Sequence, residues 1–131
     1  MEVDSRRIIE VAEEWTCDRC FKPITRIEDG WVQWLTTGSY PRIRAENLQL
    51  VHHKSASSLK NSDCGCYFDR RSMYDRFGHC VEDLPLDWFV GPRGLLRLFD
   101  MLEEGELPQE EVLELAKRLY VAGYEKKRSG R

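Results

Sequence analysis

Near its beginning the chain reads Trp15-Thr16-Cys17-Asp18-Arg19-Cys20-Phe21-Lys22-Pro23-Ile24, a CxxC turn with strand-forming residues on either side. Two cysteines at this spacing can reach one metal ion from a single turn, because the backbone amides between them fold toward the sulfur atoms. A structural zinc site needs four ligands, so this turn would supply only half of them. The other two ligands must come from elsewhere in the chain.

A predicted hairpin brings further candidate ligands back to this turn. Residues 31–35 (Trp-Val-Gln-Trp-Leu) are rich in strand formers, and residues 48–53 (Leu-Gln-Leu-Val-His-His) read as their antiparallel partner. If the first strand runs away from the CxxC turn, the second returns toward it and delivers His52 and His53. A small, polar loop follows over residues 54–65, and eleven residues after His53 the chain presents Cys64 and then Cys66.

The sequence thus predicts a site made of Cys17, Cys20, one of His52 and His53, and one of Cys64 and Cys66. Adjacent residues on a strand point to opposite faces, so only one histidine should be a ligand. His52 follows Leu48 and Leu50 on its face, whereas His53 follows Gln49 and Val51. That pattern does not choose between them. Asp63 and Asp69 could hydrogen-bond a ligating histidine, or could be loop and cap residues.

CxxC, HisHis and CxC within residues 15–66 resemble a zinc knuckle of the zinc-ribbon or treble-clef kind. The resemblance implies a structural zinc ion, although the second ligand pair is irregular. A competing interpretation is that the cysteines are buried thiols that fill the core. A redox pair at Cys17 and Cys20 is disfavoured, because Pro23 would interrupt the helix that such a motif begins.

Two other functions remain open from the sequence. The order His52-His53, Asn61, His79 resembles HNH nucleases, which carry a metal-dependent site on a hairpin and a helix, but the spacings depart from that pattern. A basic group at Arg70, Arg71 and Arg76 could hold a single-stranded nucleic acid, with the aromatic residues Tyr67, Phe68 and Tyr74 stacking on bases. A solvated helix face with buried aromatic residues explains the same pattern.

Composition narrows these choices. The 131 residues are 41% hydrophobic with a net charge of −3, which predicts one domain with its own core and disfavours binding to phosphate backbones. The five cysteines indicate metal binding or buried thiols in a reducing compartment. No apolar run is long enough to span a membrane and the N-terminus is acidic, so we expect a soluble, cytoplasmic protein with no membrane partner.

The C-terminal third predicts a helical hairpin over residues 91–123. Pro92 and Pro108 are placed to start two helices, and Gly105 and Gly123 to end them. A helix is also predicted over residues 5–14, a shorter one from a cap at Asp69 to Gly78, and a disordered basic tail over 126–131.

The predicted fold is a single α+β domain over residues 1–125, in which a zinc-knuckle-like turn and a short antiparallel sheet pack against the helical hairpin. The predicted function is a non-enzymatic zinc-binding module that acts through an unidentified protein partner. A nuclease and a nucleic-acid-binding module remain as alternatives.

Overall fold

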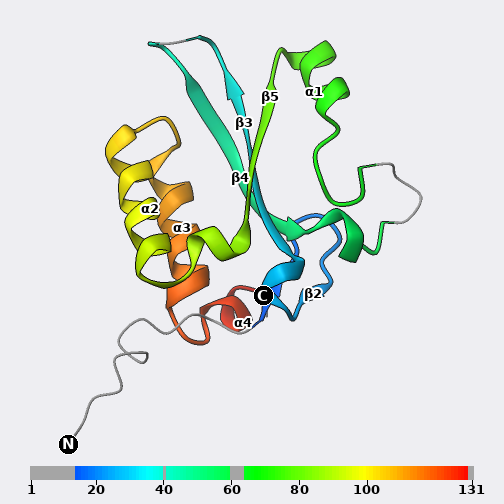
Figure 1. The fold of residues 1–131 in the computed structure, drawn as a ribbon, viewed down its shortest axis with the longest axis vertical. Helices are drawn as coiled ribbons and strands as arrows, with labels where there is room; N and C mark the ends of the chain where they lie inside the picture. Colours follow the sequence, from blue (N-terminus) through cyan, green and yellow to red (C-terminus); the bar gives the residue numbers. More distant parts are fainter. Residues whose placement is uncertain (1–13, 40, 60–63, 130–131) are drawn as a thin grey trace, which may run out of the picture.

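The computed structural model describes residues 14–39, 41–59 and 64–129. The α+β class is confirmed, because small antiparallel sheets combine with a C-terminal pair of helices (Figure 1). The strands are β1 (Trp15–Thr16), β2 (Pro23–Ile24), β3 (Gly30–Thr37), β4 (Arg44–His52) and β5 (Cys80–Pro85). The α-helices are α1 (Arg70–Phe77), α2 (Gly91–Glu104), α3 (Gln109–Tyr120) and α4 (Tyr124–Ser129). Short 3-10 turns are η2 (Ile27–Asp29), η3 (Lys54–Ala56) and η4 (Leu86–Phe89).

The central sheet has the strand order β4-β3-β5, with both pairings antiparallel. The β3–β4 hairpin was predicted and is confirmed, although both strands are longer than expected. Its register pairs Gly30 with His52, so the end of β4 returns to the side of the sheet where β3 begins. β5 was not predicted, and it pairs with β3 from Pro85, opposite Trp31, to Cys80, opposite Thr36.

The helical pair α2–α3 confirms the predicted hairpin, and Figure 1 shows the two helices side by side next to β4. Pro92 lies in the first turn of α2, and Gly105 ends that helix with a left-handed φ of 69°. The core between these helices and the sheet is formed by Val32, Leu50, Leu86, Phe89, Leu98, Val112, Leu115 and Leu119. Burial of this apolar stripe, rather than helix propensity, is the main force that holds the pair on the sheet.

The opposite face of the sheet is covered by the segment that leads into α1. Leu35, Phe68 and Val81 form a small second core there. Gln33 is buried on this face, where its amide nitrogen donates to the Cys66 carbonyl (3.3 Å) and its amide oxygen accepts from the Phe68 amide (2.9 Å). Both faces of β3 are therefore covered, and one polar side chain fixes the position of the 66–68 segment.

The chain ends differ from the prediction at residue 126. Helix α4 runs to Ser129, where a disordered tail was expected, and Arg128 donates to Glu114 of α3 (2.9 Å). The acidic side chain of Glu114 holds Arg128 against α3. The helix predicted over residues 5–14 lies outside the described residues except for Glu14, which is in no helix. Within the described part of the chain, no helix is both long and apolar enough to cross a membrane.

Candidate metal centre

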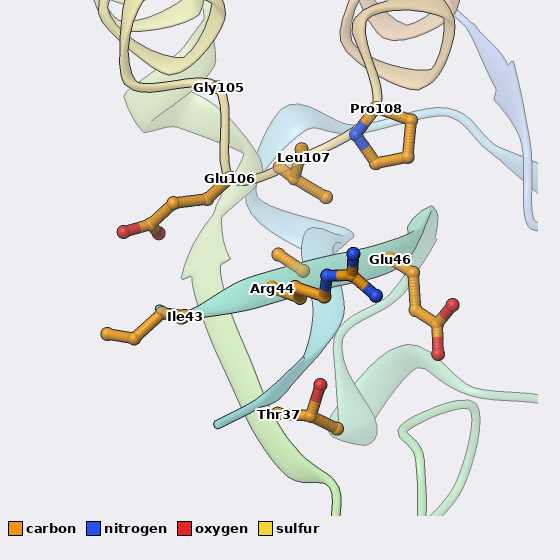
Figure 2. Close-up of a pocket in the computed structure, with 9 residues that line it drawn as sticks. Thr37, Ile43, Arg44, Glu46, Gly105, Glu106, Leu107 and Pro108 are labelled. Atoms are coloured by element: carbon orange, nitrogen blue, oxygen red, sulfur yellow. The ribbon is translucent and has the colours of Figure 1, made fainter. Parts of the chain in front are cut away.

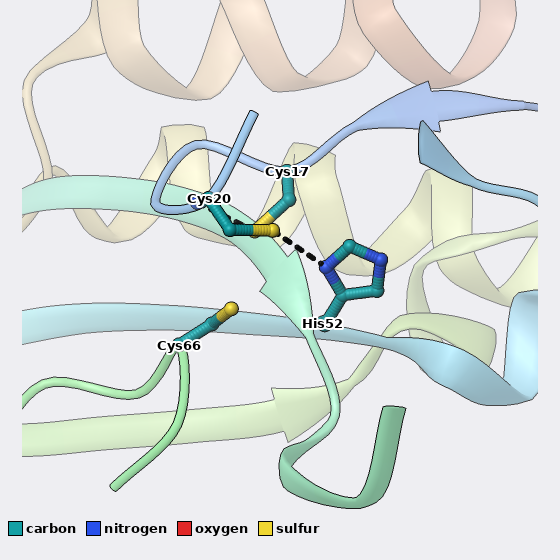
Figure 3. A group of neighbouring side chains, drawn as sticks. All are labelled: Cys17, Cys20, His52 and Cys66. Carbon is teal, nitrogen blue, oxygen red and sulfur yellow. Dashed lines mark hydrogen bonds between the residues drawn. The ribbon is translucent and has the colours of Figure 1, made fainter. Parts of the chain in front are cut away.

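Four side chains from three separate parts of the chain converge beside the end of β4 (Figure 3). Their possible ligand atoms, the sulfurs of Cys17, Cys20 and Cys66 and a ring nitrogen of His52, all lie within 4.8 Å of one another. Four such donors around one zinc ion are separated by roughly 3.5–3.8 Å, given bonds of about 2.0–2.3 Å and tetrahedral angles. The four side chains lie close enough to hold a metal ion.

The CxxC turn is built by backbone hydrogen bonds between β1 and β2. The Cys17 amide donates to the Lys22 carbonyl (3.0 Å), and the Phe21 amide donates to the Cys17 carbonyl (3.0 Å). Inside the turn, the Cys17 sulfur accepts from the amides of Arg19 (3.4 Å) and Cys20 (3.5 Å). Both amides thus point at the sulfur atom of Cys17. The tight turn places Phe21 at a left-handed φ of 62°, a conformation that side chains other than glycine rarely adopt.

His52 is the histidine that the structure brings to the cluster. Its Nδ1 lies 3.2 Å from the Cys20 sulfur, and its Nε2 lies 3.0 Å from the Pro23 carbonyl oxygen. A carbonyl can only accept, so this contact requires the proton on Nε2. Nδ1 is then left with its lone pair directed toward the thiols. Orientation of a histidine by a backbone carbonyl on its far nitrogen is typical of metal ligands.

His53 points to the other face and has a different role. Its Nδ1 accepts from the Ser55 amide (3.2 Å) and so caps the η3 turn. The ring also packs edge-on against Trp31 (5.2 Å between ring centres) and Tyr67 (6.1 Å). The two histidines therefore face apart, as expected, with His52 ending β4 and His53 just beyond it. The contact with the Pro23 carbonyl belongs to His52, the one that faces the cysteines.

Cys66 completes the cluster, and Cys64 is not among the four residues. Cys66 is fully buried, and its sulfur lies 2.9 Å from the Ser57 hydroxyl. Gly65 has a left-handed φ of 58°, and a Cβ there would meet the Ser57 side chain at 3.1 Å. The left-handed turn at Gly65 separates the two cysteines of the CxC motif, and Gln33 holds the Cys66 carbonyl.

The thiols of the cluster differ in acidity. Burial raises the pKa of Cys20, but hydrogen bonds from Ser58, from the Lys22 amide and with Cys17 and Cys66 outweigh it and lower that pKa to about 6. Burial raises the pKa of Cys66 to about 12, against the opposing hydrogen bond with Ser57. Cys20 is thus prepared as a thiolate ligand at neutral pH, whereas Cys66 would release a proton when a cation binds.

A buried ionic network joins the CxxC turn to helices α3 and α4. Asp18, between the two cysteines, accepts from the Leu50 amide (2.8 Å) and from Arg118 of α3 (2.7 Å). Arg118 also donates to Glu125 of α4 (2.8 Å) and to the Thr16 carbonyl (2.8 Å). Burial lowers the pKa of Arg118, but its bonds with Glu125 and Asp18 outweigh this and raise it, so the guanidinium stays charged. The CxxC turn is thereby tied to both C-terminal helices.

Sequence reasoning missed Asp18, Arg118, Gln33 and Ser57. Arg118 lies three residues after Leu115 and next to Leu119, on the apolar face of its helix, and that placement is the signal that could have identified it.

The residues of the alternative functions lie elsewhere. His79 precedes Cys80, which pairs with Thr36 at the far end of β3 from the Gly30–His52 pair, so it is remote from His52. Asn61 and Asp63 lie outside the described residues. Asp69 caps α1 by accepting from the Ser72 amide (3.0 Å). Arg70 is held by the Val81 carbonyl (2.8 Å) and by the Asp83 carboxylate, which leaves it less able to bind a phosphate.

A separate hollow of about 460 Å³ lies between the start of β4 and the α2–α3 loop (Figure 2). Arg44, Glu46 and Glu106 place charged groups around it. It is at the opposite end of β4 from His52, so it does not serve the cysteine cluster.

Comparison of the chain with protein-family models, with curated proteins and with solved structures finds no match.

Proposed function

We propose that Cys17, Cys20, His52 and Cys66 bind one structural Zn²⁺, and that the chain is a non-enzymatic cytoplasmic module that acts through protein contacts. The convergence of three sulfurs and one imidazole nitrogen within 4.8 Å carries this proposal. Thiolate and imidazole ligands favour zinc over magnesium or calcium, which prefer oxygen.

A closed site supports a structural role rather than a catalytic one. Three of the four side chains are buried, and a zinc ion with four protein ligands has no open position for water or substrate. Structural zinc contributes an apparent binding free energy of about 10–16 kcal/mol in small domains. That is comparable to the whole unfolding free energy of a typical domain, about 5–15 kcal/mol, so the ion would decide whether the CxxC turn and the 64–68 segment stay on the sheet.

Exposed apolar side chains support a role in protein contacts. In the described part of the chain, exposed large apolar residues include Tyr74, Phe77, Trp88, Leu96 and Phe99. The net charge of −3 favours a protein partner over a nucleic acid.

The first test is the metal content of protein purified without added metal or chelator, measured by inductively coupled plasma mass spectrometry. We expect one zinc per chain in the parent and none in a Cys17→Ser/Cys20→Ser double variant. His52→Ala and His53→Ala are a matched pair, since the residues are adjacent but face apart. His52→Ala should lose the metal and His53→Ala should keep it. A parent without metal, with a His52→Ala variant that melts like it, would remove the basis of the proposal.

The nuclease alternative is tested on the same preparations. We expect no cleavage of single- or double-stranded DNA with added Zn²⁺, Mn²⁺ or Mg²⁺. Cleavage that disappears in His52→Ala would instead identify the cluster as a catalytic site.

A further inference from the structure

The outer face of helix α2 carries large apolar side chains that nothing in the described structure covers. Leu96 is 62% exposed and Phe99 is 50% exposed, while Leu98 and Gly94 on the opposite side face the core. Leu96 and Phe99 are three residues apart, so they are neighbours on one side of the helix. Trp88 of η4 is also 48% exposed, beside the start of this helix. These rings and methyl groups contribute little to folding where they stand.

The charges on α2 run against its macrodipole. Arg93 and Arg97 lie in its first half, whereas Asp100, Glu103 and Glu104 lie in its second half. The positive end of the dipole is therefore next to cations and the negative end next to anions, which lowers helix stability. Helix α3 has the opposite and favourable order, with Glu110 and Glu111 in its first turn and Lys117 and Arg118 in its last.

Pairing within α2 does not compensate for this order. Arg93 and Arg97 are four residues apart, as are Asp100 and Glu104, and both are like-charge pairs. Among the described residues, no ion pair joins Arg93, Asp100, Glu103 or Glu104 to another side chain. Arg97 is held differently, stacked 4.9 Å from the centre of the Trp88 ring. The charge order is thus unexplained by the single chain.

An antiparallel helix of the same charge order would place opposite charges beside Arg93, Arg97, Glu103 and Glu104. It would bring its acidic second half against Arg93 and Arg97, and its basic first half against Glu103 and Glu104. Its macrodipole would also run opposite to that of α2, which is favourable. Among the described helices, α2 itself has this charge order.

We propose that the chain forms a two-fold symmetric homodimer through antiparallel packing of α2 against α2. The interface would centre on Leu96 against the partner subunit's Phe99, with Arg93 beside the partner subunit's Glu103. A hollow of about 680 Å³, lined by Asp87, Trp88, Val90, Pro92, Arg93 and Arg97, lies at the basic end and would receive acidic side chains of the second copy. The inference rests on the proposed role in protein contacts, for which it names the surface and the partner.

The dimer should be weak. Helix α2 has 14 residues and so is roughly 21 Å long, which limits the buried surface to the small end of specific interfaces. We expect a dissociation constant on the order of micromolar. Ion pairs at an exposed rim are screened by salt, so the dimer should also weaken as ionic strength rises.

The test is sedimentation equilibrium of the metal-loaded chain across a concentration series, with circular dichroism to show that each variant is folded. Leu96→Ser/Phe99→Ser should be monomeric, while Tyr74→Ser/Phe77→Ser, on the equally exposed α1, should dimerise like the parent. A parent that is monomeric at ~0.5 mM, or an unchanged dimer in Leu96→Ser/Phe99→Ser, would overturn the proposal.

Charge reversal determines the orientation. Arg93→Glu alone and Glu103→Arg alone should each weaken the dimer about tenfold or more, because like charges would meet across the interface. The double variant Arg93→Glu/Glu103→Arg should restore it, since each reversed residue meets its reversed counterpart only in an antiparallel pair. A double variant that is weaker than both single variants would contradict the antiparallel arrangement.

Native mass spectrometry of the same samples separates this proposal from the metal-binding one. Zinc-bound chains that remain monomeric at ~0.5 mM would overturn the dimer and leave the metal centre standing. Dimers without zinc would do the reverse.

Discussion

Arg118 of helix α3 donates a 2.7 Å hydrogen bond to Asp18, the residue that follows the first cysteine of the CxxC turn, across 100 positions of sequence. The Arg118 side chain is only 4% exposed, and it also neutralises Glu125 of α4. Removal of the cation would leave the largely buried carboxylates of Asp18 and Glu125 without the guanidinium that both contact, which is far more costly than loss of a surface pair.

We therefore expect Arg118→Met to lower the free energy of unfolding by about 3–5 kcal/mol in urea denaturation. Arg71→Met is the control, because Arg71 pairs with Asp75 on the surface of α1 with its side chain 92% exposed. That variant should lose less than about 1 kcal/mol. Equal effects of the two substitutions would show that the buried network adds no more than a surface pair.

The two cysteines of the CxC motif should differ in their effect on metal content. Cys66→Ser removes one sulfur of the four-residue cluster, and a serine hydroxyl is a poor zinc ligand, so the variant should bind metal far more weakly. Cys64→Ser changes a neighbour outside the cluster and should retain the metal. Titration with zinc in competition with a chromophoric chelator measures both affinities. Loss of metal from Cys64→Ser instead would mean that the turn at Gly65 rearranges around the ion.

Phe21 offers a test of backbone strain in the CxxC turn. It has a left-handed φ of 62° and its side chain is 76% exposed, so the ring gains little from packing while the backbone is disfavoured. Phe21→Gly should raise the free energy of unfolding by about 0.5–1 kcal/mol, after allowance for the greater freedom of glycine in the unfolded chain. Asn47→Gly should change it less, because asparagine tolerates its φ of 58°. Destabilisation by Phe21→Gly would indicate that the ring has contacts that stabilise the turn.

Tyr120 predicts a change of stability at high pH. Its hydroxyl donates to the carbonyls of Phe89 (2.7 Å) and Gly91 (3.0 Å), and burial raises its pKa to about 12. The pKa of Tyr120 in the folded chain lies above the ordinary value near 10. The stability that this buried hydroxyl contributes is therefore fully present below pH 10 and is lost as the pH rises through about 12. Tyrosinate absorbs at about 295 nm, so ultraviolet absorbance at that wavelength follows the loss of the proton. This late titration should be seen in the parent and be absent from Tyr120→Phe.

Much of this fold could be predicted because local signals agreed with tertiary packing. Pro92 and Gly105 mark the ends of α2 by backbone chemistry that needs no knowledge of neighbours. β5 escaped prediction because Cys80–Pro85 contains Glu82, Asp83 and a terminal proline, all of low strand propensity. Its pairing with β3, together with Arg70 bound to the Val81 carbonyl, overrides that propensity.

The sequence predicts the candidate ligands as a set of cysteines and histidines, but it does not predict which histidine and which cysteine of the CxC motif join Cys17 and Cys20. Strand alternation requires that His52 and His53 point to opposite faces, but it does not say which of them faces the cysteines. His52 does, and its ring contacts the Pro23 carbonyl, 29 positions away in the sequence. The choice of Cys66 depends on Gln33 and Ser57, whose contacts with it span 33 and 9 positions. Neither residue type nor periodicity encodes these contacts between separate segments of the chain.

The hydrogen bonds between Asp18 and the backbone of Leu50 have a consequence for aggregation. β4 is an edge strand of the central sheet. On its outer side, the Leu50 amide donates to the Asp18 carboxylate (2.8 Å) and the Leu50 carbonyl accepts from the Asp18 amide (2.9 Å). The Leu48 amide donates to the Glu111 carboxylate (2.8 Å). An uncovered strand edge is a template on which other chains can add strands. Because Asp18 lies between two of the proposed metal ligands, release of the turn would uncover part of this edge, and a metal centre would then also protect the chain against sheet-to-sheet association.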